Sequence, residues 1–184
     1  VEPGVVLGLL GPNGAGKTTA MKLLLGLHVP TAGHCDVFGK RMSPNAADLR
    51  RRIGFLPTNP TFPPGMTPIT YLDFMGKLSG LTRAVRKSRL SGLIRAVDLL
   101  SASSQKIKGF STGMRTRLGI AASLMNDPEL LIWDEPTAGL DPEGRKHTIE
   151  LIRELGRNKT VIVSSHILSD IDIVCSHVAV LHSG

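Results

Sequence analysis

The chain has 184 residues, a length typical of one domain, and 41% of them are hydrophobic, which is enough to bury a substantial core. Its formal net charge of +7 would favour a polyanionic partner, although the basic stretch 83–108 contains no aromatic residue for stacking on single-stranded nucleic acid. No apolar run approaches the roughly 18 residues of a membrane span.

Short apolar runs predict strands, and amphipathic patterns between them predict helices. The predicted strands are residues 5–10, 53–56, 130–133, 160–164 and 178–181. Helices are predicted at about 17–25 and at 142–155, the second with Asp141 as its N-cap and proline at its first position. Short apolar strands that alternate with amphipathic helices predict an α/β fold with a mostly parallel sheet.

Residues 67–126 interrupt this alternation, because no strand pattern appears among them. Thr67 and Pro68 predict the start of a helix whose apolar residues recur every three positions. Thr82 predicts the start of a second helix that reaches Leu100. We therefore expect one domain made of a P-loop catalytic core, residues 1–61 and 126–184, and an inserted helical subdomain, residues 62–125.

The sequence GPNGAGKTT at residues 11–19 fits the pattern G-x-x-x-x-G-K-[ST] between a predicted strand and a predicted helix. Glycines allow backbone N–H groups to turn toward phosphate oxygens, and the helix N-terminus adds the positive end of its dipole. We expect Lys17 to reach the β- and γ-phosphates and the hydroxyl of Thr18 to ligate Mg²⁺. The residues predicted to bind the phosphates are Gly11, Pro12, Asn13, Gly14, Ala15, Gly16, Lys17, Thr18 and Thr19.

The sequence LLIWDEP at residues 130–136 predicts a buried strand that ends in two acids. Ligands bind at the carboxyl ends of strands in sheets of this kind. Asp134 is therefore a candidate for the Mg²⁺ shell. Glu135 is a candidate for a general base that activates water against the γ-phosphate, a role typically worth ~10²–10⁴ in rate. Alone, two acids could be merely a polar strand end, but the glycine-rich loop strengthens the functional interpretation.

The stretch FSTGMRTRLGIAASLMNDPELLIWDEPTAGLDP at residues 110–142 closely resembles the signature-to-D-loop region of ABC-type ATPases. SSHIL at residues 164–168 resembles the switch-histidine segment of that family. The resemblance covers essentially the whole chain and is greatest to ATPase subunits of bacterial and archaeal exporters whose membrane subunit is a separate chain. It implies a P-loop NTPase (RecA-like) fold with a mostly parallel sheet and an inserted α-helical subdomain.

The resemblance also implies roles for particular residues. The catalytic residues would be Lys17, Glu135 and His166, the signature residues acting in trans would be Ser111, Thr112, Gly113 and Met114, and the D-loop residue at the dimer interface would be Asp141. The signature residues would present a helix N-terminus, which attracts anions, to the γ-phosphate held by the other monomer. Ordinary N-capping by Ser111 or Thr112 is the alternative interpretation of this stretch.

The chain departs from the family pattern in two respects. Thr58 stands at the Q-loop position, where the family usually has Gln, in a proline-rich loop that we interpret as the hinge to the helical subdomain. A Thr hydroxyl is too short to reach the Mg²⁺ shell or the attacking water unless the loop moves inward or a water bridges. We therefore expect slow turnover of ATP, and Thr58→Gln should raise the rate.

The second departure concerns the ends of the chain. The family has strands before the phosphate loop, with an aromatic residue that contacts adenine, and the family fold continues beyond the position of residue 184. We expect a chain truncated at both ends that binds nucleotide more weakly than a complete subunit.

By this resemblance the chain would bind ATP and Mg²⁺ and hydrolyse ATP as a homodimer or with a paired ATPase subunit. Hydrolysis would power export through a separate transmembrane permease, with the chain peripheral on the cytoplasmic face and in contact with the membrane only through that permease. We expect no nucleic acid partner.

One alternative is a non-transport ATPase of the same family that acts on nucleic acid or ribosomes, which the positive charge mildly favours. Another is a P-loop phosphotransferase, which has no use for a signature helix or a switch histidine.

Overall fold

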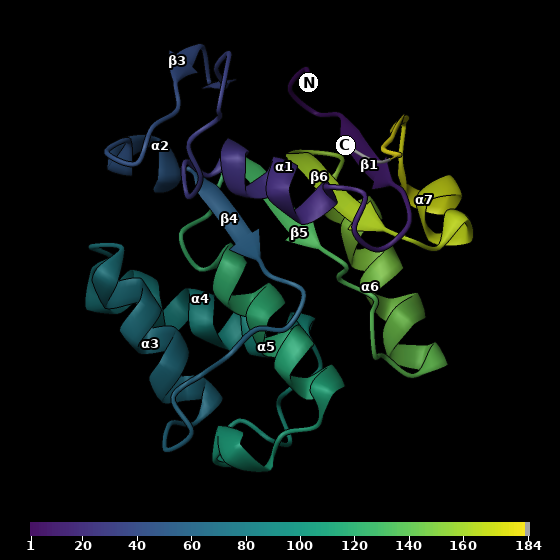
Figure 1. Ribbon diagram of the computed structural model, residues 1–184. Coiled ribbons are helices and arrows are strands. Elements are labelled where there is room, and N and C mark those ends of the chain that lie inside the picture. The colour runs from purple at the N-terminus through teal and green to yellow at the C-terminus, as the bar shows by residue number, and fades with distance from the viewer. Residues whose placement is uncertain (183–184) are drawn as a thin grey trace.

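The main sheet has the strand order β4-β5-β6-β1-β7 in the computed structural model, which describes residues 1–182 (Figure 1). Its strands are β1 (Val6–Leu10), β4 (Ile53–Leu56), β5 (Leu130–Asp134), β6 (Thr160–Ser165) and β7 (His177–Val180). The strand pairs in this sheet are parallel, with Gly8 opposite Val163 and Leu131 opposite Val161. The predicted α/β class is confirmed, and the predicted strand ends differ from the observed ones by one residue at most.

The helices cover both faces of this sheet and one of its edges (Figure 1). Within residues 1–182 they are α1 (Lys17–Leu24), α2 (Ala47–Arg50), α3 (Pro68–Leu78), α4 (Arg83–Ala96), α5 (Thr112–Leu124), α6 (Pro142–Leu155) and α7 (Leu168–Val174), with a 3₁₀ turn at Ile107–Gly109. None of these helices is both long and apolar enough to traverse a lipid bilayer. A separate antiparallel pair, β2 (Asp36–Val37) and β3 (Lys40–Arg41), has strands too short to be recognised from periodicity.

The side chains of β5 alternate between two hydrophobic cores, which explains why this strand is an uninterrupted apolar run. Leu131 and Trp133 join the core that α5, α6 and α7 cover. Leu130 and Ile132 join the opposite core, where Met21 of α1 is fully buried. Burial on both faces is the expected condition of a central parallel strand. The same alternation directs the side chain after Trp133 toward α1, the helix that follows the glycine-rich loop.

Helices α3, α4 and α5 lie together beside the β4 edge of the sheet, in agreement with the predicted absence of strands from this part of the chain (Figure 1). A side chain at Gly54 of β4 would collide with the carbonyl oxygen of Ser123 in α5. A side chain at Gly119 of α5 would lie 2.5 Å from Leu56 and 3.2 Å from Pro60. The proline-rich loop and α5 are therefore in close contact, while the expected subdomain boundaries at 62 and 125 stay a prediction.

One sequence-based expectation about a helix end was wrong. The helix that begins after Thr82 ends at Ala96 rather than Leu100, because Asp98 adopts the left-handed φ of 52° that stops a helix. The predicted start of α6 is confirmed, since Asp141 stands at its N-cap with an extended backbone and proline follows at the first position, although the Asp141 side chain makes no capping hydrogen bond. The predicted cap of α3 is also confirmed, since Thr67 and Thr70 form a reciprocal capping box.

The indole of Trp133 gives a test of this packing. Its Nε1 atom donates to Oγ of Ser123 at 3.0 Å, and the side chain is fully buried. Ser123→Ala would leave that donor unpaired in the core, which costs about 1–3 kcal/mol. We expect the melting temperature to fall by roughly 2–4 °C for each kcal/mol, measured by calorimetry. Ser104→Ala at an exposed site is the control; equal melting temperatures for the two variants would contradict this account.

Candidate functional site

The loop between β1 and α1 forms one wall of a cavity of about 220 Å³, which residues 12–19 line together with Thr58, Asp134 and Glu135. Gly16, at the N-cap of α1, has a φ of 100°, a left-handed conformation that favours glycine. No side chain caps this helix. The first turn therefore leaves backbone N–H groups available to an anion in the cavity, as the glycine-rich motif predicts.

Lys17 supplies a buried positive charge to this cavity. Its side chain is 6% exposed, and its Nζ atom donates to the carbonyl oxygens of Gly11 at 2.7 Å and Pro12 at 3.3 Å. The same Nζ lies 3.5 Å from Oε1 of Glu135. These oxygens partly compensate the ammonium group, and a phosphate that entered the cavity would be a stronger partner than the two neutral carbonyls.

Asp134 connects three segments of the chain through its carboxylate. Oδ2 accepts hydrogen bonds from the hydroxyls of Thr18 at 2.6 Å and Thr58 at 2.8 Å. Oδ1 accepts a hydrogen bond from the hydroxyl of Ser164. These donors come from the start of α1, from the loop after β4 and from β6, so one buried carboxylate fixes their relative positions.

The oxygen atoms of Thr18 and Asp134 fit the chemistry of Mg²⁺, which prefers hard oxygen ligands. Magnesium commonly binds through one or two protein groups together with substrate phosphates and water, rather than in an all-protein cage. Residues 1–182 contain no group of three or more His, Cys, Asp or Glu side chains placed to hold a metal ion. The donor set therefore fits a metal that arrives with a phosphate ligand.

Glu135 has an unusual backbone and one oxygen that makes no hydrogen bond. Its φ of 54° is left-handed, a conformation that costs a non-glycine residue about 1–3 kcal/mol. The backbone N–H donates to Oγ of Ser164 at 2.9 Å, which stabilises the turn. Oε2 lies 2.8 Å from Nδ1 of His166, whereas Oε1 is buried, has the ion pair with Lys17 and makes no hydrogen bond. A buried carboxylate oxygen without a hydrogen bond is rare and indicates a place for a water or ligand.

Ser164 is a site residue that the sequence analysis missed. Its hydroxyl bridges the carboxylate of Asp134 and the backbone N–H of Glu135. A polar residue that ends an otherwise apolar strand was the available indication, and Ser164 precedes the histidine of the predicted switch segment by two positions.

Thr58 contacts the site directly. Leu56 of β4 pairs with Trp133 of β5, so the chain that leaves β4 passes beside the carboxylate that follows Trp133. The hydroxyl of Thr58 reaches Oδ2 of Asp134 at 2.8 Å without a bridging water. The expectation that this hydroxyl is too short to reach the Mg²⁺ shell or the attacking water stays a prediction. What the structure adds is a direct contact between Thr58 and Asp134, the residue expected to hold that metal.

The predicted signature and D-loop residues lie outside this cavity. Ser111 caps α5 by accepting a hydrogen bond from the backbone N–H of Met114 at 3.2 Å, so the capping role that the sequence analysis considered is observed. The first turn of α5 instead faces the loop before α6, where a side chain at Gly139 would lie 3.1 Å from Thr112. Asp141 is exposed. The structure thus brings together six of the predicted site residues, namely Lys17, Thr18, Thr58, Asp134, Glu135 and His166. The predicted signature residues Ser111, Thr112, Gly113 and Met114 and the D-loop residue Asp141 do not line the same cavity.

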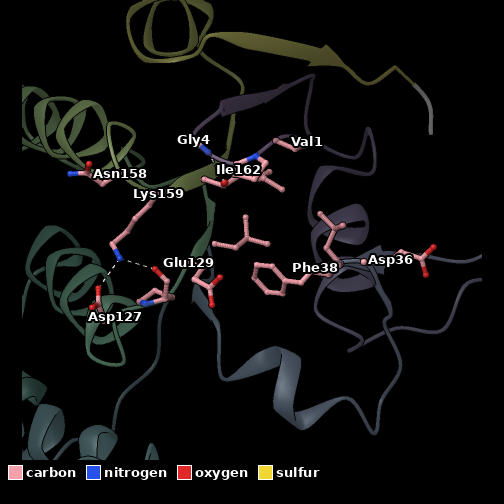
Figure 2. Close-up of a pocket in the computed structure, with 16 residues that line it drawn as sticks. Val1, Gly4, Asp36, Phe38, Asp127, Glu129, Asn158, Lys159 and Ile162 are labelled. Carbon is pink, nitrogen blue, oxygen red and sulfur yellow. Dashed lines mark hydrogen bonds and ion pairs between the residues drawn. The ribbon is translucent and has the colours of Figure 1, made fainter.

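A larger cavity of about 720 Å³ lies at the other end of the strands, where β5 and β6 begin (Figure 2). Phe38 and Glu129 line it, and Lys159 pairs with Asp127 at 2.7 Å (Figure 2). The Lys159 ammonium holds the pKa of Asp127 below its ordinary value. The lining contains none of the residues predicted for phosphate binding or catalysis, so this cavity is separate from the candidate site.

Comparison with known proteins agrees with this geometry. The chain is 41% identical over 186 residues to the bacitracin transport ATP-binding protein BcrA of Bacillus licheniformis, a match that covers 100% of this chain and 60% of that protein. It is 38% identical over 185 residues to the Nod factor export ATP-binding protein I of Cupriavidus metallidurans, covering 100% of this chain and 61% of that one. The chain thus spans about three fifths of the length of these relatives.

A solved structure described as the ATP binding subunit of an ABC transporter has a similar fold. It superposes with a TM-score of 0.89 at 31% sequence identity, over 98% of this chain and 76% of that one. The profile of the family described as ABC transporter matches residues 1–138, which include the glycine-rich loop, the signature residues 111–114 and the two acids Asp134 and Glu135 at the end of β5. The P-loop fold and the resemblance drawn from the motifs are both confirmed, and the chain belongs to the ABC transporter family.

Proposed function

We propose that the protein hydrolyses ATP to ADP and phosphate as a nucleotide-sandwich dimer, and that this reaction powers export through a separate membrane permease. The observation that carries the proposal is the convergence of Lys17, Asp134 and Glu135 on one cavity behind an uncapped helix N-terminus. The names of the two relatives, one in bacitracin transport and one in Nod factor export, support transport and the outward direction.

The phosphates of ATP would bind where α1 begins. Backbone N–H groups of residues 13–19 and the ammonium of Lys17 would replace water around the phosphate oxygens. Thr18 and Asp134 would hold Mg²⁺, which when bound neutralises phosphate charge and orients the γ-phosphate for in-line attack. The cavity is small, which suits the phosphates rather than a whole nucleotide, so the base would lie outside it.

Glu135 would act as the general base. A water placed between Oε1, which makes no hydrogen bond within the chain, and the γ-phosphate would donate to that oxygen and lose a proton to it during attack. Nδ1 of His166 restrains Oε2, so the carboxylate is oriented before substrate arrives. The imidazole of His166 is 46% exposed, which leaves its other edge free to meet the γ-phosphate.

The second half of each site would come from another subunit, either a second copy of this chain or a paired ATPase subunit. Ser111, Thr112, Gly113 and Met114 lie at an exposed helix start and do not reach the cavity of their own chain. Across a dimer interface this helix start would face the γ-phosphate held by the partner. Asp141, exposed on the adjacent loop, would lie at the same interface.

The permease would bind at a groove of about 890 Å³ beside the proline-rich loop. Phe62 and Tyr71 line it and stack edge to face with ring centroids 4.9 Å apart. Leu78 at the end of α3 also lines it and is 65% exposed. The chain would then be peripheral on the cytoplasmic face of the cell membrane, in contact with the bilayer only through the permease, and without a nucleic acid partner.

Replacement of Glu135 tests the catalytic assignment. Glu135→Gln keeps the size of the side chain but cannot accept a proton from water. We expect kcat for ATP hydrolysis to fall by about 10²–10⁴, while the affinity for ATP stays nearly unchanged. Phosphate release and calorimetric titration of the full-length protein measure the two quantities. Glu154→Gln, at an exposed site on α6, should behave as wild type; a Glu135→Gln variant with wild-type kcat would refute the assignment.

Thr58 can be tested with three variants. Thr58→Val removes the hydroxyl that donates to Asp134, a hydrogen bond to a charged group worth about 1.5–3 kcal/mol, so we expect kcat to fall roughly 10–100-fold. Thr58→Ser keeps the donor and should stay close to wild type. Thr58→Gln places a longer donor at the same position and should raise the rate. If Thr58→Val and Thr58→Ser hydrolyse ATP equally fast, the hydrogen bond has no part in turnover.

The permease surface is tested by a charge in the groove. Leu78→Asp should weaken co-purification with the permease from membranes, because an exposed apolar contact would become a desolvated carboxylate. ATP binding should not change. Leu100→Asp is a matched control, since Leu100 is 60% exposed but lies outside the groove. Equal recovery of the permease with both variants would place its binding site elsewhere.

A further inference from the structure

A buried carboxylate behind the candidate site joins three parts of the chain. Asp170 of α7 is 4% exposed. It accepts a hydrogen bond from the hydroxyl of Thr137 at 2.7 Å and another from Nε of Arg145 at 2.8 Å. Arg145 also donates to Oγ of Ser169 at 3.1 Å. Thr137 lies in the loop after β5 and Arg145 lies on α6, so this cluster ties both to the helix that follows the switch histidine.

The cluster links the same two segments that carry Glu135 and His166. Thr137 is two residues after Glu135, and Asp170 is four residues after His166. The segments thus meet twice, once at the cavity through the contact of Glu135 with His166 at 2.8 Å, and once in the interior through Thr137 and Asp170. The contact at the cavity is partly exposed, whereas the interior contact is buried.

The Glu135–His166 contact needs such support. Glu135 has a left-handed backbone, which relaxes unless neighbouring structure holds it. His166 follows the last residue of β6, its imidazole is 46% exposed, and the helix after it begins without a side-chain cap. The hydrogen bond from Thr137 to the carboxylate of Asp170 is buried, and such a bond holds its partners more rigidly than an exposed contact does, because solvent does not compete for the donor.

We propose that Asp170 is a positioning residue for the Glu135–His166 pair. It holds the segment after β5 against the segment after β6, and Arg145 fixes α6 to the same point, so that the carboxylate and the imidazole face each other before substrate binds. The consequence for hydrolysis rests on the ATPase function proposed above. The placement of the two segments does not depend on that function.

The experiment uses variants of Thr137 in the full-length protein, because Thr137→Val removes the donor to Asp170 with almost no change in shape. We expect kcat for ATP hydrolysis to fall by roughly tenfold or more, the size of one hydrogen bond to a charged group, while KM for ATP stays within about twofold. Thr137→Ser, which keeps the hydroxyl, should restore kcat. Thr148→Val is the matched control, since Thr148 is a buried threonine on α6 and is not among the donors to Asp170.

Amide hydrogen exchange gives a second readout that does not require hydrolysis. Exchange in segments 136–141 and 166–170 should be faster in Thr137→Val than in Thr137→Ser. The exchange rates of the strands of the main sheet should be the same in both variants. A wild-type kcat in Thr137→Val, or an equal loss in Thr148→Val, would overturn the proposal. If wild-type protein hydrolysed no ATP, the proposed function would fail, and the exchange comparison alone would decide the role of Asp170: unchanged exchange in Thr137→Val would refute it.

Discussion

The carboxylate of Asp134 is the interaction on which the candidate site depends. Hydroxyl groups from three segments donate to it, so the start of α1, the loop after β4 and the end of β6 meet at one point. A buried carboxylate is stable only where donors compensate its charge. Here the donors are side chains that themselves belong to the site, and the same hydrogen bonds therefore satisfy the buried carboxylate oxygens and position the residues around the cavity.

A continuous series of polar contacts connects Asp134 to the other residues of the site. The hydroxyl of Ser164 links Asp134 to the backbone of Glu135, whose carboxylate lies between Lys17 and His166. The polar groups are thus held in place by the protein before any ligand enters, so binding would not have to order them. The left-handed backbone of Glu135 and the absence of a hydrogen bond to its Oε1 both cost stability, and both occur where catalysis is proposed.

The parts of the fold that sequence analysis predicted well are those with a local cause. The apolar run of β5, the glycine-rich loop and the Thr67 cap each follow from neighbouring residues. The errors have causes that are not local or not periodic. The end of α4 depends on the left-handed backbone of Asp98. Hydrogen bonds between Thr137 and Asp170, 33 residues apart, arise only when two strands end side by side, so no spacing in the sequence indicates them.

The central claim is that Asp134 holds Mg²⁺ beside the phosphates of ATP, and calorimetric titration with ATP tests it most directly. Titrations in Mg²⁺ and in EDTA should be compared for wild type and Asp134→Asn. The account expects Mg²⁺ to raise the ATP affinity of wild type by roughly tenfold, the size of one charge-assisted contact, and expects Asp134→Asn to lose that increase while still binding ATP in EDTA. An equal increase in both proteins, or none in wild type, would contradict it.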